Sequence, residues 1–211
     1  ALLAMWNPEA LAHDWILPDN FHVHVKVMGT MRETVHFLNK PYETYMRVNT
    51  PMSEGRSLGA NIIHSVDGFI VREMVRRCSY DPERIQELHE LTLSPFTHGR
   101  EVRTKNDKIV LELTKLYKRT GYLSARILDH LTKDNLGHIG AAPIGELIDT
   151  LPQKPFPVVP VHDCFRVHPN YGNDLRKQYN LQLALIANSN MLSYLLSQLL
   201  GKQINITKQA H

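Results

Sequence analysis

The amino-acid sequence predicts an α+β fold in which antiparallel β-hairpins pack on helices, with a helical segment inserted between two parts of one domain. Three observations predict it. Residues 15–50 contain stretches that alternate between apolar and polar side chains, as strands do. Residues 60–151 contain apolar residues at helical spacing, and a second short hairpin precedes a long helical stretch near the C-terminus.

The composition is that of an ordinary globular protein. The chain has 211 residues, of which 43% are hydrophobic, and it is long enough for one domain with an inserted subdomain. No apolar run reaches the roughly 18 residues that a membrane span needs, so we expect no membrane. The two cysteines form no CxxC pair, which favours a reducing, cytoplasmic compartment. The net charge of +3 is compatible with nucleic-acid binding without being specific for it.

The first elements are expected to be strands. The turn signal Pro18-Asp19-Asn20 separates residues 15–17 from residues 21–27, which alternate, and this predicts a β-hairpin. Residues 42–48 alternate again and predict a third strand. Residues 51–59 are rich in Ser, Glu, Gly and Arg and predict a loop.

The middle of the chain is expected to be helical. Asp81 has the residue type of an N-cap, and Pro82 that of a first helical position. Residues 94–105 are polar and predict a loop. The predicted helices span residues 60–77, 83–91, 107–119, 122–133 and 142–151.

The last part of the chain is expected to return to the first domain. Residues 152–160 contain four prolines and predict a rigid extended connector. Residues 161–167 predict a tight hairpin with Asp163 at or near its tip. Residues 173–200 predict one long helix that Gly201 ends, before a polar tail.

Two segments carry a recognisable chemistry. One is His64-Ser65-Val66-Asp67-Gly68 near a helix start, and the other is Val161-His162-Asp163-Cys164-Phe165 in the predicted hairpin. Together with the hairpin at residues 15–27, they stand in the order found in the C-terminal third of phage T7-like, single-subunit RNA polymerases. The chain resembles the palm of that family, and the two-subunit RNA polymerase of N4-like phages is the nearest match we recognise.

The resemblance implies roles for particular residues. Asp163 matches the aspartate of motif C, which holds a catalytic magnesium ion, and Cys164 replaces the serine that usually follows it. His162, His64, Ser65 and Arg72 are expected to bind nucleic acid. Asp67 and Gly68 are expected to be structural, with Asp67 capping its helix near the N-terminus.

The implied reaction is nucleotidyl transfer from NTPs to a growing RNA on a DNA template. Two Mg²⁺ ions about 4 Å apart stabilise the attacking 3′ oxygen and the leaving pyrophosphate. Magnesium takes hard oxygen ligands and retains several waters, so one or two carboxylates hold it.

The resemblance also indicates what the chain lacks. The family's second metal-binding aspartate (motif A) and its nucleotide-gripping helix (motif B) have no match in the sequence. We therefore expect a second polymerase subunit, or a missing N-terminal region, to supply them in the cytoplasm of an infected or lysogenic bacterial cell. The expected organisation is a palm at residues 1–78 and 155–202, a helical insertion at 79–154 and a polar tail at 203–211.

Several other interpretations remain open. The chain is alternatively a non-catalytic nucleic-acid-binding or assembly subunit derived from a polymerase palm, and His64 is alternatively a core histidine. Cys164 with His162 or His168 would suit a cysteine-dependent hydrolase. His22 and His24, with His13 or His36, would suit a zinc site. The basic residues of the insertion either track phosphates or form a solvated face: Arg100, Arg103, Lys105, Lys115, Lys118, Arg119 and Arg126.

Overall fold

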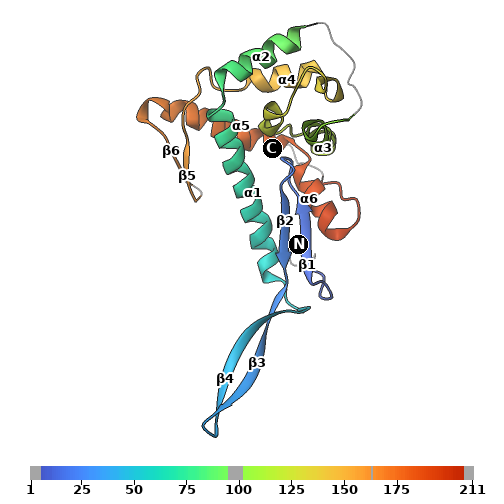
Figure 1. Cartoon of the computed structure of the whole chain (residues 1–211), viewed down its shortest axis with the longest axis vertical. Coiled ribbons are helices and arrows are strands. Elements are labelled where there is room, and N and C mark those ends of the chain that lie inside the picture. Colours follow the sequence, from blue (N-terminus) through green and yellow to red (C-terminus); the bar gives the residue numbers. More distant parts are fainter. Residues whose placement is uncertain (1–5, 95–101, 163, 207–211) are drawn as a thin grey trace.

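The computed structural model describes residues 6–94, 102–162 and 164–206. Within these residues the fold is mixed α+β, with six α-helices and three antiparallel two-stranded sheets. Figure 1 shows helix α1 (Arg56–Cys78) running through the middle of the molecule, with most other helices gathered at one end and a long ribbon of two strands projecting from the other. The predicted α+β class is confirmed.

The first hairpin forms as predicted. Strands β1 (Ala12–Ile16) and β2 (His22–Lys26) pair antiparallel, with Trp15 opposite Val23. The connecting turn is closed by Leu17 N–H, which donates to the carbonyl of Phe21 at 3.0 Å. The hairpin therefore presents one apolar face to α1 and a polar face to solvent.

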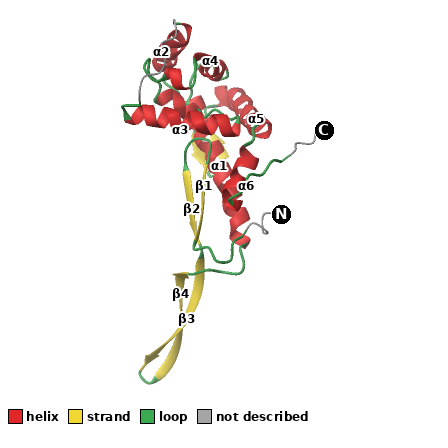
Figure 2. Ribbon diagram, turned by 90° about the vertical axis from the view of Figure 1, so that its right-hand side faces the viewer, coloured by secondary structure: helices red, strands yellow, loops and turns green. Residues whose placement is uncertain are grey.

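The second hairpin is a long ribbon, formed by β3 (Met28–Phe37) and β4 (Lys40–Asn49). The predicted strand at residues 42–48 is β4, whereas the sequence did not single out its partner β3. Figure 2 shows the ribbon extending away from the helices. Its pairs place Met31 opposite Met46 and Val35 opposite Tyr42 on one face, and all four side chains are exposed.

Helix α1 begins earlier than the sequence predicted. It starts at Arg56, whereas the sequence predicted a loop at residues 51–59 and a helix from residue 60. The predicted start is therefore four residues late. Its N-cap Gly55 lies under the Trp6 ring, where a Cβ would come within 2.0 Å of a ring carbon. Trp6 is held there because its Nε1 donates to the Met52 carbonyl at 2.7 Å. This hydrogen bond joins residues 46 positions apart and holds the Trp6 ring against the start of the helix.

Two clusters of buried side chains surround α1. One joins it to the first hairpin and to helix α6 (Met191–Leu200), and the other joins it to the segment that follows residue 155. The first cluster consists of Trp15, Leu17, Leu58, Ile62, Phe69, Tyr122, Met191 and Leu195. The second consists of Ile70, Met74, Cys78, Phe156 and Val158.

A third core belongs to helices α2 (Pro82–Leu93), α3 (Lys105–Thr120) and α4 (Ala141–Asp149). The predicted cap of α2 is confirmed, since the Asp81 side chain accepts from Glu83 N–H. The buried residues of this core all lie between positions 88 and 148, within the range predicted as an insertion. The boundaries of that insertion stay a prediction.

The predicted helix at residues 122–133 is wrong. Only a short 3₁₀ helix, η2 (Ala125–Asp129), forms there, followed by a second at Leu136–His138. The Tyr122 side chain is buried against Phe69, with their rings edge to face at 5.0 Å. Because this contact and the hydrogen bonds of the following residues fix the backbone, tertiary packing overrides the helical pattern.

The predicted single helix at 173–200 is also wrong. It is divided into α5 (Gly172–Asn188) and α6, bent by 55°. At the break, the Ser189 hydroxyl accepts from Met191 N–H at 3.2 Å, and Asn190 N–H donates to the Thr120 carbonyl at 2.6 Å. Gly201 ends α6 in the left-handed conformation, as predicted. The predicted tail at 203–211 is described only as far as residue 206.

Among the described helices, none is by itself long and apolar enough to cross a membrane. One bent pair, Pro169–Asn188 with Met191–Leu200, passes the same test of length and composition together. Part of that pair lies in the core, since Met191, Leu195 and Leu196 are buried.

Candidate functional site

The predicted hairpin that carries the motif C resemblance is present. Strands β5 (Val159–Val161) and β6 (Cys164–Arg166) pair antiparallel, with Val161 opposite Cys164. Positions 162 and 163 connect these two strands in the sequence. His162 is exposed and has a φ of 55°, the backbone conformation that tight hairpin turns require. Asp163, the predicted catalytic and metal-binding residue, lies outside the described residues.

The hairpin is anchored on α1 by its inner residues. Phe165 and Val158 pack with Ile70 and Met74 in one buried cluster. Below the hairpin, Phe156 N–H donates to the Cys78 carbonyl at 2.7 Å. The turn therefore stands on a fixed base that is formed by the same helix as the His64–Gly68 segment.

The residues of that segment divide into exposed and engaged groups. His64 is exposed on α1, so its alternative as a core histidine is wrong. Ser65 is engaged, because its hydroxyl donates to the Ile62 carbonyl at 2.7 Å and accepts from Trp15 Nε1 at 3.0 Å. Gly68 is half-buried, and a Cβ there would make only an ordinary contact with Arg72.

The expected role of Asp67 as a helix cap is wrong. Asp67 is exposed and lies near the middle of α1, about three turns from Gly55, the N-cap. The error follows from the late predicted start of the helix. The exposed imidazole of His64 and the exposed carboxylate of Asp67 lie about one helical turn apart, because they occupy positions i and i+3 of α1.

Arg72, predicted to bind nucleic acid, holds the first hairpin turn, and its predicted role stays a prediction. Its Nε and Nη2 donate to the two carboxylate oxygens of Asp19 at 2.6 and 3.2 Å. Its guanidinium also lies over the Phe21 ring, 4.1 Å from the centroid. These contacts join the turn to α1 through a bidentate ion pair and a ring contact.

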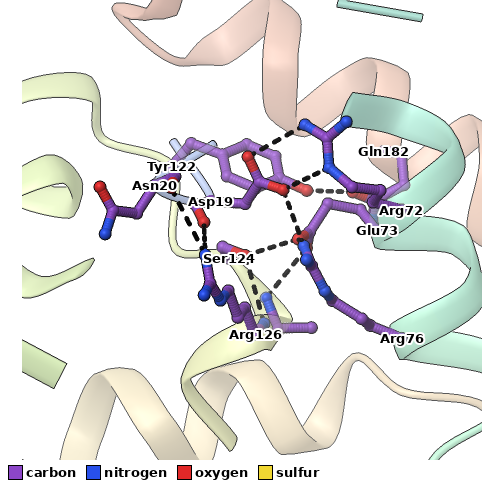
Figure 3. Close-up of polar contacts among 10 residues, drawn as sticks. Asp19, Asn20, Arg72, Glu73, Arg76, Tyr122, Ser124, Arg126 and Gln182 are labelled. Carbon is purple, nitrogen blue, oxygen red and sulfur yellow. Dashed lines mark hydrogen bonds and ion pairs between the residues drawn. The ribbon is translucent and has the colours of Figure 1, made fainter. Parts of the chain in front are cut away.

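A buried polar network extends from this pair, and Figure 3 shows its members converging between three segments of the chain. Asp19 and Glu73 have side chains with 0% exposure, and both accept from Arg76 Nη1 at 2.9 Å. Glu73 also accepts from the Ser124 hydroxyl and from Ala125 N–H at 2.9 Å. Arg126 Nη1 donates to the Asp19 carbonyl at 2.8 Å.

The electrostatics of the network favour the ionised carboxylate. Burial would raise the pKa of Asp19, but hydrogen bonds and positive charge from Arg72 and Arg76 outweigh it and hold that pKa below its usual value. Arg72 and Arg76 pair with the two buried carboxylates, and Arg126 adds a third guanidinium that binds the Asp19 carbonyl. The arrangement of the network is that of a structural joint.

Sequence reasoning missed this network. Asp19 was recognised only as a turn residue, and Arg126 only as a basic residue of the insertion. A signal was present in α1, where Arg72, Glu73, Arg76 and Arg77 fall within two turns of a helix whose neighbours are apolar. Charged residues at such positions are buried only when they are paired.

The described residues offer no candidate metal centre. No three or more His, Cys, Asp or Glu side chains gather there in a way that could hold a metal ion. The alternative zinc site at His22 and His24 therefore has no third ligand among them, and His24 Nδ1 instead lies 2.6 Å from Asp14 Oδ1. Asp163 lies outside the described residues.

Comparison with known proteins adds no family to this site. No family model matches the chain, and no curated protein matches it. The functional interpretation therefore rests on the β5–β6 hairpin, on α1 and on the residues that they carry.

Proposed function

We propose that this chain is the palm part of a DNA-directed RNA polymerase and that Asp163 ligates magnesium during nucleotidyl transfer. One observation carries the proposal. Strands β5 and β6, which flank Asp163 in the sequence and pair with Val161 opposite Cys164, are anchored on the helix that bears His64-Ser65-Val66-Asp67-Gly68. The two motifs of the family resemblance thus share one structural base.

The proposed roles follow from the anchoring of each element. Phe165 of β6 packs on the buried cluster that contains Val158 and residues of α1, and a metal-binding carboxylate requires such a rigid support. Exposed His162 and His64 are available to contact the DNA template or the RNA product. When bound, the two Mg²⁺ ions would stabilise the attacking 3′ oxygen of the RNA and the leaving pyrophosphate of the incoming NTP.

Within the proposal, the second metal-binding carboxylate and the nucleotide-gripping helix come from a second subunit or from another part of the same protein. Ser65 and Arg72 also make internal contacts that hold the first hairpin on α1. The proposed setting is the cytoplasm of an infected or lysogenic bacterial cell.

The test is Asp163→Asn in the complete polymerase, purified from its source with any partner subunit. Removing a ligand of the catalytic metal should lower RNA synthesis on a DNA template by about 10²-fold or more, since metal stabilisation of the transition state contributes several kcal/mol. Assembly, followed by size-exclusion chromatography, should be unchanged because the substitution alters no residue of the buried cluster that holds the hairpin on α1.

The matched control is Asp67→Asn, which removes an exposed carboxylate from α1 and should leave synthesis within about twofold of wild type. Retained activity in Asp163→Asn would remove the catalytic proposal. It would favour a non-catalytic nucleic-acid-binding or assembly subunit instead.

A further inference from the structure

A cavity of about 750 Å³ lies between the end of α3, helix α6 and the segment that follows Gly201. In the view of Figure 1, α6 and the β5–β6 hairpin stand on opposite sides of α1. They also pack on α1 through different buried clusters, so the cavity is separate from the proposed catalytic turn. Its lining consists of Arg119, Asn190, Ser193, Tyr194, Ser197, Gln198, Gly201, Lys202, Gln203, Ile204, Asn205 and Ile206.

The lining has an unbalanced charge. Arg119 and Lys202 contribute two cations, and none of the described residues that line the cavity is a carboxylate. Most of the others end in hydroxyl or amide groups, which donate hydrogen bonds. A lining of this kind favours an anionic ligand that accepts several hydrogen bonds.

The walls of the cavity are held in place by specific contacts. The hydroxyls of Ser197 and Ser193 accept from the N–H groups of Ile204 and Ile206 at 2.9 and 3.1 Å, which ties the last described segment to α6. Arg119 hydrogen-bonds the Tyr194 side chain. The Asn190–Thr120 backbone bond joins the start of α6 to the end of α3. Arg119 and Lys202 therefore lie on segments that hydrogen bonds join to α6.

We propose that this cavity binds a phosphate group, carried either by a free nucleotide or by a short single strand of nucleic acid. Arginine presents a planar fork that matches phosphate oxygens, and lysine adds a point charge. The volume falls in the range of small-ligand sites, about 300–1,000 Å³. The Tyr194 ring and Ile204 add a surface on which a base or sugar can pack.

The binding test uses the full chain with two probes, ATP and a short oligothymidylate. The variant Arg119→Gln/Lys202→Gln should weaken binding of at least one probe by about tenfold or more, as expected when charge-assisted hydrogen bonds are lost. For the oligothymidylate, the slope of log affinity against log salt should fall by about 1.4 in magnitude, since a single strand loses roughly 0.7 for each phosphate contact.

The matched control is Lys108→Gln/Lys133→Gln, which removes the same charge from two exposed lysines that do not line the cavity. It should bind both probes as wild type does. In NMR titrations, the backbone amides of Ser193, Ser197 and Gly201 should shift with the probe that binds. A response to ATP alone identifies a nucleotide site, and a response to the oligothymidylate alone identifies a strand site.

The proposal is overturned if neither probe binds, if the two double variants behave alike, or if the α6 amides do not shift. It does not depend on the polymerase assignment. Asp163→Asn should leave binding in this cavity unchanged, so the two proposals fail separately.

Discussion

Asp19 shows how one residue can be misjudged from its local sequence. It follows Pro18 in a turn, where an exposed carboxylate is the usual outcome. Its side chain has 0% exposure and is paired with Arg72 and Arg76, which lie more than 50 positions away. The residue type predicts the turn, whereas the burial depends on where α1 lies.

Asp19→Asn should destabilise the protein by about 3–5 kcal/mol, because it leaves Arg72 without its carboxylate partner and Arg76 with Glu73 alone. Urea denaturation at neutral pH measures the loss. Asp14→Asn, in the neighbouring strand β1, removes an exposed carboxylate and should cost no more than about 1 kcal/mol. A loss in Asp19→Asn as small as in that control would show that the pair contributes no stability.

The same pair predicts a pH dependence. Because the pKa of Asp19 is lower in the folded protein than in the unfolded chain, its contribution is complete above the unfolded pKa of about 3.9. That contribution is lost as pH falls through the folded pKa. The acid-induced loss of stability below about pH 4 should therefore be shallower in Asp19→Asn than in wild type.

At the scale of elements, the sequence predicted those whose causes are local. Pro18-Asp19-Asn20 marks the first hairpin, and Asp81 with Pro82 starts α2 as expected. The errors occur at residues 122–133 and 189–190, where contacts with Phe69, Glu73 and Thr120 decide the backbone. Such contacts are not encoded in local periodicity.

The ribbon β3–β4 contains a locally unfavourable turn. Leu38 and Asn39 both have positive φ, at 47° and 57°, and Leu38 is 82% exposed. A leucine in this conformation is strained, by roughly 1–2 kcal/mol, because its Cβ approaches the backbone. Asparagine and glycine adopt it readily and are the preferred residues of such two-residue turns.

Leu38→Asn/Asn39→Gly should therefore stabilise the ribbon by about 1 kcal/mol. Hydrogen exchange of the amides in β3 and β4 should slow by roughly fivefold. The thermal midpoint of the whole protein should barely change, since the ribbon projects from the rest of the molecule. Unchanged exchange in the ribbon would contradict the strain argument.

At the scale of the whole molecule, the chain has separate cores that polar contacts join. One core lies within residues 88–148, and the others surround α1. Glu73 connects α1 to Ser124 and Ala125, beside the end of the first hairpin. The sequence indicated a palm-like part and a helical part, but not the residues that join them, because these pairs are distant in sequence. For the proposed site, the sequence likewise predicted the β5–β6 hairpin but not the residues that hold this hairpin on α1.

Glu73→Ala tests whether this joint makes the parts unfold together. The substitution leaves Arg76 with one buried carboxylate and the Ser124 hydroxyl without its acceptor, and should cost about 3–5 kcal/mol in urea denaturation. Glu112→Ala removes an exposed partner of Lys115 at the same spacing and should cost at most about 1 kcal/mol.

The distribution of the loss distinguishes a joint from a merely local defect. Amides of β1, β2 and α1 should lose hydrogen-exchange protection in Glu73→Ala, while amides of α3 around Leu113 keep more of theirs, since that core has its own apolar contacts. Equal loss in both regions would mean that the molecule unfolds as a single unit. In that case the network would be one part of a continuous core, and the boundary predicted near residue 79 would have no energetic counterpart.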